Sequence, residues 1–250
     1  MEQKLRILVV DDDRRMTRTL ADILSMSGHL PVEAASGAEA LELARKQPFD
    51  CVLTDVRMPG MDGVELHRQL RQSLPGLPVM LMTAYASDEI IRKGLEEGVV
   101  GVFDKPLDIN SMLGFFHSLA RQRSIVIVDD DPDFCKTLSD ILRQRGFSTL
   151  QFCDPRVDVE LLASDAQVLL LDMKLNGLSG LDVLRDIRRR YPDLPVLMVT
   201  AYREEMQAAI QAALEINAFT CLYKPLEIPM LLQTLADFQL KRLRKVIKNK

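Results

Sequence analysis

The segment Ile7-Leu-Val-Val-Asp-Asp-Asp13 returns almost unchanged as Ile125-Val-Ile-Val-Asp-Asp-Asp131 in this chain of 250 residues. Three further blocks recur in the same order: Leu53-Thr-Asp-Val56 with Leu170-Leu-Asp-Met173, Leu81-Met-Thr-Ala-Tyr85 with Met198-Val-Thr-Ala-Tyr202, and Asp104-Lys-Pro-Leu107 with Tyr223-Lys-Pro-Leu226. Asp129 follows Asp11 by 118 residues, a period much longer than the roughly 20 to 50 residues of a solenoid repeat. The sequence therefore predicts two copies of one domain, each with its own core.

Within each copy, short runs of Val, Leu and Ile alternate with longer stretches of helical period. Predicted strands cover residues 5–10, 32–34, 51–54, 79–82 and 102–103 in the first copy and 125–128, 148–152, 168–171, 196–199 and 220–222 in the second. Several of these strands are apolar without alternation, as strands buried on both faces are. Strands that alternate with helices predict an α/β fold, in which helices cover both faces of a parallel sheet.

The boundary between the copies is expected between residues 117 and 124, which gives domains of residues 1–122 and 123–250. The second domain ends in a basic segment, Lys241 to Lys250, that contains no acidic residue. A solvated helix end is the simpler interpretation, because cations favour the carboxyl end of a helix dipole. A docking patch for an anionic partner is the alternative.

The composition excludes several classes of protein. A net charge of -4 and a pI near 5.5 give no general attraction to nucleic acid or anionic membranes, so neither is an expected partner. No run approaches the about 20 apolar residues of a membrane span, and Met1 to Leu5 does not resemble a secretory signal, so a cytoplasmic location is expected. The widely spaced cysteines, Cys51, Cys135, Cys153 and Cys221, are interpreted as reduced packing residues.

Acidic residues stand where the predicted parallel strands end, and such strand ends meet at one edge of a sheet. In the first copy this places Asp11, Asp12, Asp55, Thr83 and Lys105 together, and in the second copy Asp129, Asp130, Asp172, Thr200 and Lys224. Clustered carboxylates repel one another unless a cation intervenes, and oxygen ligands favour Mg²⁺. A carboxylate nucleophile, a metal ion, a lysine and a hydroxyl donor together indicate phosphoryl transfer onto aspartate.

The same residues resemble the receiver domain of two-component response regulators, in two copies that cover nearly the whole chain. The resemblance rests on Asp11-Asp12, the segment Asp55-Val-Arg-Met-Pro-Gly-Met-Asp-Gly63, Thr83-Ala84 and Lys105-Pro106, with their counterparts in the second copy. It implies two consecutive doubly wound, flavodoxin-like domains with five strands in the order 2-1-3-4-5. It also implies that a histidine kinase, a phosphotransfer protein or a small acyl phosphate donates the phosphoryl group, as in a phosphorelay.

By this resemblance Asp55 and Asp172 are the phosphoacceptors. The implied Mg²⁺ ligands are Asp11, Asp12, Asp55 and the Arg57 carbonyl, with Asp129, Asp130, Asp172 and the Lys174 carbonyl in the second copy. Thr83, Thr200, Lys105 and Lys224 would bind the phosphoryl group, and the Lys105-Pro106 and Lys224-Pro225 bonds would be cis. The expected function is a phosphorylation-controlled signalling protein rather than an enzyme, acting on a downstream protein that the sequence does not identify.

The chain departs from the receiver pattern in three places. Val102 and Cys221 replace the aromatic residue that many receivers carry three positions before the lysine, so another surface is expected to report the activated state. The second copy has Asn176 where the first has Pro59, which predicts a looser loop after Asp172. The segment Cys153-Asp-Pro-Arg-Val, which follows the second predicted strand of the second copy, is also irregular. In addition, bulky residues near each acceptor, Arg57 with Tyr85 and Lys174 with Tyr202, are predicted to shield the acyl phosphate from water.

Two other functions stay open at this point. A Mg²⁺-dependent phosphohydrolase would use an aspartate nucleophile, but would place it on the first strand, at Asp11 or Asp129. Alternatively, one copy has lost its chemistry and serves only as an interaction domain. The sequence leaves open whether the protein forms a homodimer.

Overall fold

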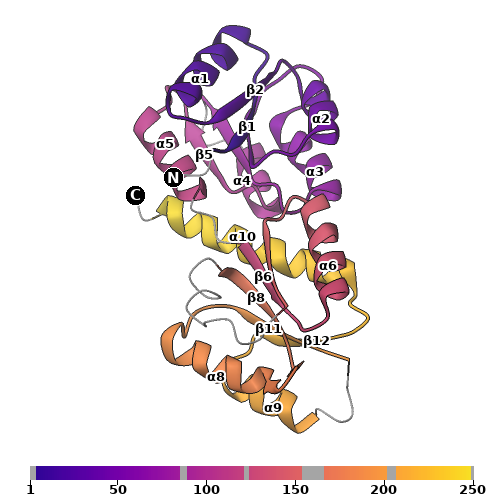
Figure 1. The fold of residues 1–250 in the computed structure, drawn as a ribbon. Helices are drawn as coiled ribbons and strands as arrows, with labels where there is room; N and C mark the ends of the chain where they lie inside the picture. Colours follow the sequence, from indigo (N-terminus) through magenta and orange to yellow (C-terminus); the bar gives the residue numbers. More distant parts are fainter. Residues whose placement is uncertain (1–3, 85–88, 121–123, 154–165, 202–206, 249–250) are drawn as a thin grey trace. The chain divides into compact units, whose positions relative to one another are not determined.

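The computed structural model describes residues 4–84, 89–120, 124–153, 166–201 and 207–248. The chain divides into two compact units (Figure 1). Unit 1 comprises Met1–Arg121 together with Gln239–Lys250, and unit 2 comprises Gln122–Phe238. Each unit contains a five-stranded sheet in which every neighbouring pair of strands is parallel.

The sheet of unit 1 has the strand order β2-β1-β3-β4-β5. Its strands are β1 (Arg6–Val10), β2 (Leu30–Ala34), β3 (Cys51–Asp55), β4 (Val79–Thr83) and β5 (Gly101–Asp104). Every residue of β3 and β4 is buried, because these strands lie in the middle of the sheet with helices on both faces. Burial on both faces explains why each sequence is a continuous apolar run that becomes polar only at its end, at Thr54 and Asp55 in β3 and at Thr83 in β4.

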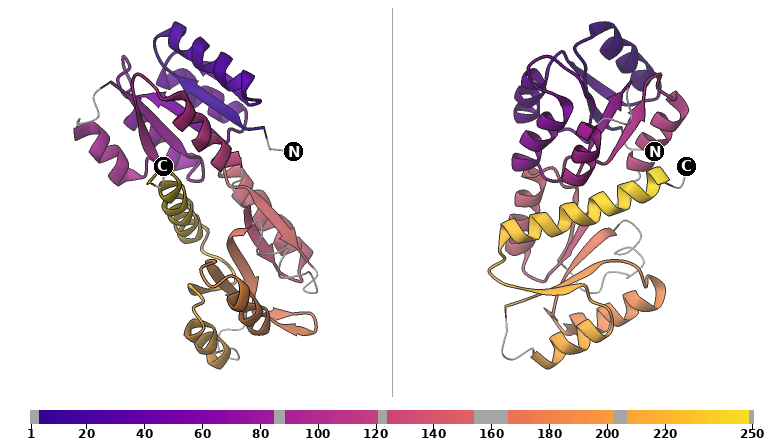
Figure 2. Two further views of the ribbon diagram at one scale, coloured as in Figure 1. Left: turned by 90° about the vertical axis from the view of Figure 1, so that its left-hand side faces the viewer. Right: turned by 180° about the vertical axis from the view of Figure 1, so that it is seen from behind.

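In the described part of unit 1, four helices connect these strands, a fifth follows β5, and the terminal helix of the chain adds a sixth. The five are α1 (Arg14–Met26), α2 (Gly37–Lys46), α3 (Gly63–Ser73), α4 (Glu89–Glu97) and α5 (Ile109–Ala120). Ile7 and Val9 of β1 pack in one core cluster with residues of α1 and α5. Leu8 and Val10 alternate with them and pack in a second cluster with residues of α2 and α3. The helices α1 and α5 lie on one side of the sheet, and α2 and α3 lie on the other (Figure 1, Figure 2).

Unit 2 repeats this architecture with the strand order β12-β11-β8-β6-β7, which is the order of unit 1 read from the other edge. Its sheet consists of β6 (Ser124–Val128), β7 (Thr149–Phe152), β8 (Ala166–Asp172), β11 (Val196–Thr200) and β12 (Thr220–Tyr223). Its helices are α6 (Pro132–Gln144), α8 (Gly180–Arg190), α9 (Gln207–Glu215) and the first part of α10 (Ile228–Lys248). Both orders correspond to the predicted 2-1-3-4-5 arrangement, which is confirmed.

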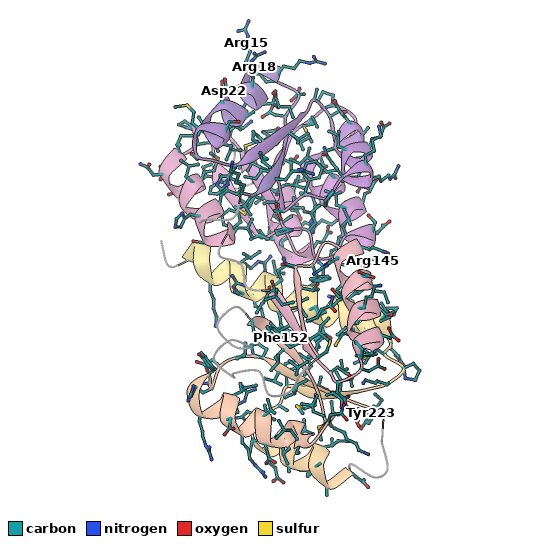
Figure 3. The ribbon with its side chains drawn as sticks, in the orientation of Figure 1. Arg15, Arg18, Asp22, Arg145, Phe152 and Tyr223 are labelled. Atoms are coloured by element: carbon teal, nitrogen blue, oxygen red, sulfur yellow. The ribbon has the colours of Figure 1, made fainter. Side chains whose placement is uncertain are left out.

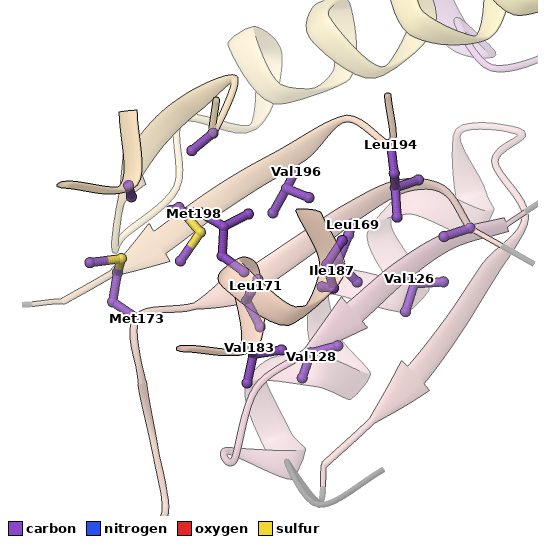
Figure 4. Close-up of a cluster of buried hydrophobic side chains, with 14 of the residues drawn as sticks. Val126, Val128, Leu169, Leu171, Met173, Val183, Ile187, Leu194, Val196 and Met198 are labelled. Carbon is purple, nitrogen blue, oxygen red and sulfur yellow. The ribbon is translucent and has the colours of Figure 1, made fainter. Parts of the chain in front are cut away.

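Two core clusters cover the two faces of the unit 2 sheet. Val126 and Leu169 pack with α8 residues such as Ile187 (Figure 4). On the other face, Ile125 and Ile127 pack with α6 and the first part of α10. The Cys153-Asp-Pro-Arg-Val segment that begins the second copy's irregular region lies outside the described residues from position 154 onward.

The loop after Asp172 differs from its predicted form. Instead of a looser loop, residues Lys174–Leu175 (β9) and Leu178–Ser179 (β10) form a short antiparallel hairpin. Asn176 and Gly177 connect its strands, and Gly177 has a φ of 79°, a conformation that glycine adopts without strain. An Asn-Gly pair is the residue combination that tight hairpin turns favour, so the signal was present in the sequence.

The end of α10 belongs to unit 1 by its contacts, whereas the sequence predicts a second domain of residues 123–250. Leu243 is only 1% exposed and joins the cluster that contains Phe115 and Phe116. The Arg244 guanidinium donates hydrogen bonds to the Leu95 carbonyl and, at 2.7 Å, to the Val99 carbonyl. Part of the basic segment is therefore packed rather than solvated, because an apolar side chain within it fills the core of unit 1. None of the described helices is both long and apolar enough to cross a membrane.

Candidate functional site

The predicted site residues of unit 1 stand at the carboxyl ends of three adjacent strands. Asp55 is the last residue of β3 and Thr83 the last residue of β4, while Asp11 directly follows β1. Lys105 directly follows β5, and its backbone N–H donates to the Thr83 carbonyl at 2.6 Å. All three side chains at the strand ends are buried, at 2% exposure for Asp11 and Thr83 and 8% for Asp55.

The Lys105 ammonium group joins the two buried carboxylates. Its Nζ atom lies 2.8 Å from Oδ2 of Asp11 and also donates to Oδ1 of Asp55. Burial alone would lower the pKa of Lys105, but the hydrogen bonds and charges of these two carboxylates raise it overall. The lysine is therefore charged and compensates two acids that would otherwise repel each other.

Backbone N–H groups hold the remaining carboxylate oxygens of these two acids. The Arg57 N–H donates to Oδ2 of Asp55 at 2.7 Å, and the Asp13 N–H donates to Oδ1 of Asp11 at 3.0 Å. Each carboxylate is thus fixed at one oxygen by the backbone and at the other by Lys105. This arrangement orients Asp55 before any ligand arrives, as a preorganised site requires.

A glycine allows the start of α3 to approach the backbone of Asp55. A Cβ atom added to Gly63 would lie 2.3 Å from the Asp55 carbonyl oxygen, well inside any real contact. The Gly63 N–H also donates to the Val56 carbonyl at 3.0 Å. Gly180 has the same role in unit 2, where an added Cβ would lie 2.1 Å from the Asp172 carbonyl. Both glycines therefore determine how the strand that ends in Asp55 or Asp172 meets the following helix.

Unit 2 contains the same arrangement with small differences. The Nζ atom of Lys224 lies 2.6 Å from Oδ2 of Asp129 and 2.9 Å from Oδ1 of Asp172. The Lys174 N–H donates to Oδ2 of Asp172 at 2.7 Å, and the Lys224 N–H donates to the Thr200 carbonyl at 2.8 Å. Asp129, Asp172 and Thr200 are all buried. The two sites of the chain are thus nearly identical in their contacts.

Two features distinguish the second site. Lys224 Nζ lies over the ring of Phe134, 4.1 Å from its centroid, which adds a cation–π contact. Burial, together with the nearby charge of Asp172, raises the pKa of Asp129 despite its hydrogen bond from Lys224. In the first unit the residue that corresponds to Phe134 is Met16, so the lysine there lacks this aromatic neighbour.

The oxygen-rich donor set fits a magnesium ion that keeps part of its water shell. Among the described residues, no group of three or more His, Cys, Asp and Glu side chains converges closely enough to hold a metal ion by side chains alone. Each site instead offers two buried carboxylates, the neighbouring acid Asp12 or Asp130, and the backbone carbonyl of Arg57 or Lys174. Mg²⁺ is commonly bound by one or two carboxylates and several waters, so this set is sufficient.

Not all predicted residues are equally placed. Asp12 is exposed and Asp130 half-buried, unlike the acids before them. The side chains of Arg57 and Lys174 are also exposed, although their backbone N–H groups donate to the carboxylates of Asp55 and Asp172. The Lys105-Pro106 and Lys224-Pro225 bonds are cis, as the resemblance implied. Tyr85 and Tyr202 lie outside the described residues.

Comparisons with known proteins agree with this arrangement. Residues 7–116 and 125–236 each match the response regulator receiver domain family. A response regulator receiver protein from Anaeromyxobacter sp. (strain Fw109-5) is 36% identical over 199 residues, which is 80% of this chain and 84% of that protein. Response regulator MprA from Mycobacterium sp. (strain KMS) is 38% identical over 129 residues, or 52% of this chain and 55% of MprA. Among solved structures, the chemotaxis response regulator CheY4 of Vibrio cholerae is 28% identical, with a TM-score of 0.44, 47% of this chain covered and 99% of CheY4.

The chain therefore belongs to the response regulator receiver domain family and contains two receiver domains in tandem. It spans about half the length of MprA, so properties of that whole protein do not transfer directly. The predicted class of protein, a two-component response regulator, is confirmed.

Proposed function

We propose that both receivers accept a phosphoryl group, on Asp55 in unit 1 and on Asp172 in unit 2. The observation that carries the proposal is the lysine bridge: in each unit one ammonium group contacts the acceptor and a second buried aspartate. A cation that contacts both carboxylates is also well placed to neutralise the negative charge on the three oxygens of an incoming phosphoryl group.

The chain contributes mainly orientation and charge to this reaction. A carboxylate oxygen of the acceptor attacks the phosphorus of a phosphohistidine or small acyl phosphate, and the bond from phosphorus to the leaving group breaks. The Arg57 and Lys174 N–H groups keep each acceptor carboxylate oriented for this attack. Lys105 and Lys224 then pair with the phosphoryl group, and the Thr83 and Thr200 hydroxyls, at the ends of β4 and β11, donate to it.

Magnesium is the cofactor that this donor set suits. When bound by Asp11, Asp12, Asp55 and the Arg57 carbonyl, or by Asp129, Asp130, Asp172 and the Lys174 carbonyl, it supplies positive charge to the phosphoryl oxygens. The carboxylates themselves are already fixed by lysine and backbone contacts, so ion binding needs little rearrangement of the acceptors.

The protein is then a signalling protein without an output reaction of its own in the described residues. Its donors would be a histidine kinase or phosphotransfer protein in the cytoplasm, and phosphorylation would change its affinity for a downstream protein. Because Val102 and Cys221 replace the usual aromatic residue, this change would be reported through another surface.

Intact-mass analysis with acetyl phosphate and Mg²⁺ tests the proposal. The wild type should gain two phosphoryl groups, Asp55→Asn and Asp172→Asn one each, and the double variant none. Asp22→Asn, which changes an exposed carboxylate on α1, is the matched control and should behave as the wild type (Figure 3). A phosphoryl group found on Asp11 or Asp129 would indicate a hydrolase-like site instead. Modification of only one receiver would leave the other as an interaction domain.

A further inference from the structure

Two cysteines of unit 2, Cys135 and Cys153, lie near the backbone of Asp129, and the site described above does not use them. The Cys135 thiol, on the first turn of α6, donates to the Asp129 carbonyl at 3.4 Å. The Asp129 N–H donates to the carbonyl of Phe152 at 3.2 Å, and Cys153 is the next residue. Cys135 therefore contacts the Asp129 backbone directly, and Cys153 adjoins the residue that accepts a hydrogen bond from the same backbone.

The packing of α6 on β7 brings these two side chains together. Ser139, one turn further along α6, contacts the Thr149 hydroxyl at 2.7 Å, and Arg143 donates to the same hydroxyl at 2.8 Å. The helix therefore runs antiparallel to the strand: its later residues lie over Thr149, and its first turn lies toward the end of the strand near Phe152. Cys135 lies in this first turn, and Cys153 directly follows Phe152.

The two thiols are electrostatic neighbours of unequal exposure. Burial raises the pKa of Cys135 to about 12, and a hydrogen bond with the Cys153 side chain contributes to this rise. Cys135 is buried, whereas Cys153 is exposed, contrary to its interpretation as a packing residue. One thiol of the pair can therefore meet a dissolved oxidant while the other is held next to it.

The first receiver provides a natural comparison. The residues that correspond to Cys135 and Cys153 are Thr17 and Ala35. The Thr17 hydroxyl donates to Glu33 of β2 at 2.9 Å, which confirms that this helix position faces the second strand of the sheet. The same place in the fold thus carries a thiol pair only in unit 2.

We propose that Cys135 and Cys153 form a reversible disulfide that slows phosphorylation of Asp172. The disulfide follows from the geometry of unit 2 alone. Its effect on phosphorylation rests on the proposed function.

Hydrogen peroxide is a sufficient oxidant. The exposed Cys153 thiol attacks one peroxide oxygen, the O–O bond breaks, and Cys153 becomes a sulfenic acid as one water leaves. The Cys135 sulfur then attacks the Cys153 sulfur, the S–O bond breaks, and the hydroxyl leaves as a second water with the Cys135 proton. In total the two thiols lose two hydrogen atoms, and the peroxide is reduced to two waters.

The disulfide acts on the site through Asp129. Oxidised Cys135 has no S–H to donate, so the Asp129 carbonyl loses its 3.4 Å hydrogen bond, and the cross-link pulls the first turn of α6 toward the end of β7. Asp129 is one of the two carboxylates that hold Lys224 beside Asp172. Disturbing this charge-assisted pair should slow phosphorylation of Asp172 about tenfold or more.

The first experiment tests the cross-link in the full chain. The protein is treated with hydrogen peroxide, free thiols are alkylated, and peptides are mapped with and without a phosphine reductant. We expect one intramolecular peptide pair that joins Cys135 to Cys153 and disappears on reduction. Cys153→Ser, an exposed substitution that spares the core, should abolish it, whereas Cys221→Ser should not. Cys153 found only as a sulfinic acid, or joined to a second molecule, would overturn the proposal.

The second experiment measures the effect on the site. Oxidised and re-reduced proteins are phosphorylated with acetyl phosphate and Mg²⁺, and phosphate on Asp55 and Asp172 is quantified separately. Oxidation should slow phosphorylation of Asp172 only, with Asp55 as internal control and Cys153→Ser insensitive to peroxide. Equal rates at Asp172 before and after oxidation would overturn the regulatory part of the proposal. Phosphate on neither aspartate in the reduced protein would contradict the proposed function instead, while leaving the cross-link result intact.

Discussion

The Nζ atom of Lys224 lies 2.9 Å from Oδ1 of Asp172, and the same ammonium group lies 2.6 Å from Oδ2 of Asp129. Lys105 makes the matching contacts with Asp55 and Asp11 in the first receiver. In each unit one partly buried cation therefore compensates two buried anions. Because the lysine comes from the loop after the last strand and the acids from two central strands, this contact connects three strand ends of each sheet.

Replacing this lysine should lower the phosphorylation rate more than replacing a lysine on the surface. We expect Lys105→Ala to lower the rate of Asp55 phosphorylation by about ten- to a hundredfold, because a charge-assisted contact of about 1.5 to 3 kcal/mol is lost at the acceptor. Lys224→Ala should do the same at Asp172. Site-resolved mass spectrometry after incubation with acetyl phosphate measures both.

The unchanged receiver of the same molecule is the control for each lysine variant. Lys46→Ala removes a cation of similar type whose side chain is 72% exposed, and it should leave both rates as they are. If Lys105→Ala leaves the rate at Asp55 unaltered, the lysine bridge is only structural and the proposed role of Lys105 is wrong.

Gly63 and Gly180 should tolerate no side chain. A methyl group at Gly63 would meet the Asp55 carbonyl at 2.3 Å, so the start of α3 must move away from the acceptor strand. We expect Gly63→Ala to destabilise unit 1 by about 1 to 3 kcal/mol, as overpacking does, and to slow Asp55 phosphorylation. Urea unfolding and site-resolved phosphorylation are the measurements.

A variant of Gly60, in the same loop, distinguishes the effect of backbone strain from the effect of a steric clash with Asp55. Gly60 has a φ of 82° and nothing within 4 Å of an added Cβ, so Gly60→Ala strains the backbone without touching Asp55. It should lower stability by about 1 kcal/mol with a smaller effect on phosphorylation. Equal losses of phosphorylation in the two variants would show that Gly63 has no special relation to the acceptor.

The strands and the site were predictable because their signals are local and repeated. Asp11, Asp55 and Lys105 each stand at or just after the end of a predicted strand, and parallel topology alone brings such strand ends together. The second copy has the same residue types at the matching strand ends, Asp129, Asp172 and Lys224. The sequence does not reveal the hydrogen-bond partner of each carboxylate oxygen. For example, the Arg57 N–H rather than the Arg57 side chain holds Asp55, because the conformation of the loop after β3 places that N–H beside the carboxylate.

Other features depend on contacts between distant residues, which no local pattern reveals. Leu243 lies in a basic stretch, yet it is buried in the core of unit 1 because the helix that carries it packs there. The proximity of Cys135 and Cys153 likewise depends on the register of α6 against β7, since their sequence spacing resembles no known motif. The Asn176-Gly177 hairpin is different, because its sequence signal was present and was interpreted only as a missing proline.

His67 should make the stability of unit 1 depend on pH. Its ring is 4% exposed, and burial lowers its pKa, even though its Nε2 atom lies 3.2 Å from the Glu97 carbonyl oxygen. Arg71 and Arg68 nearby also disfavour the charged form. Below about pH 6.5 the unfolded chain therefore binds more protons than the folded one, and the free energy of unfolding falls as the pH decreases through this window.

An NMR titration of the three histidines tests this directly. The His67 ring should titrate below the ordinary value, whereas His117, which is exposed, is the comparison. Urea unfolding of unit 1 should show the stability loss in the wild type and retain it in His117→Gln. If His67 instead titrates at the ordinary value of a histidine, its burial does not control its charge, and the predicted loss of stability should be absent as well.

Leu243 should stabilise the first receiver, although it follows the second receiver in the sequence. Its side chain packs in the unit 1 cluster, so Leu243→Ala should destabilise unit 1 by about 2 to 5 kcal/mol, as cavities in cores do. Hydrogen exchange of the β1 and β3 amides measures this effect in the intact protein. Lys241→Ala, which changes an exposed side chain of the same helix, should leave exchange unchanged. Faster exchange confined to the strands of unit 2 would contradict this prediction. The end of α10 would then stabilise the second receiver, as the predicted domain of residues 123–250 implies.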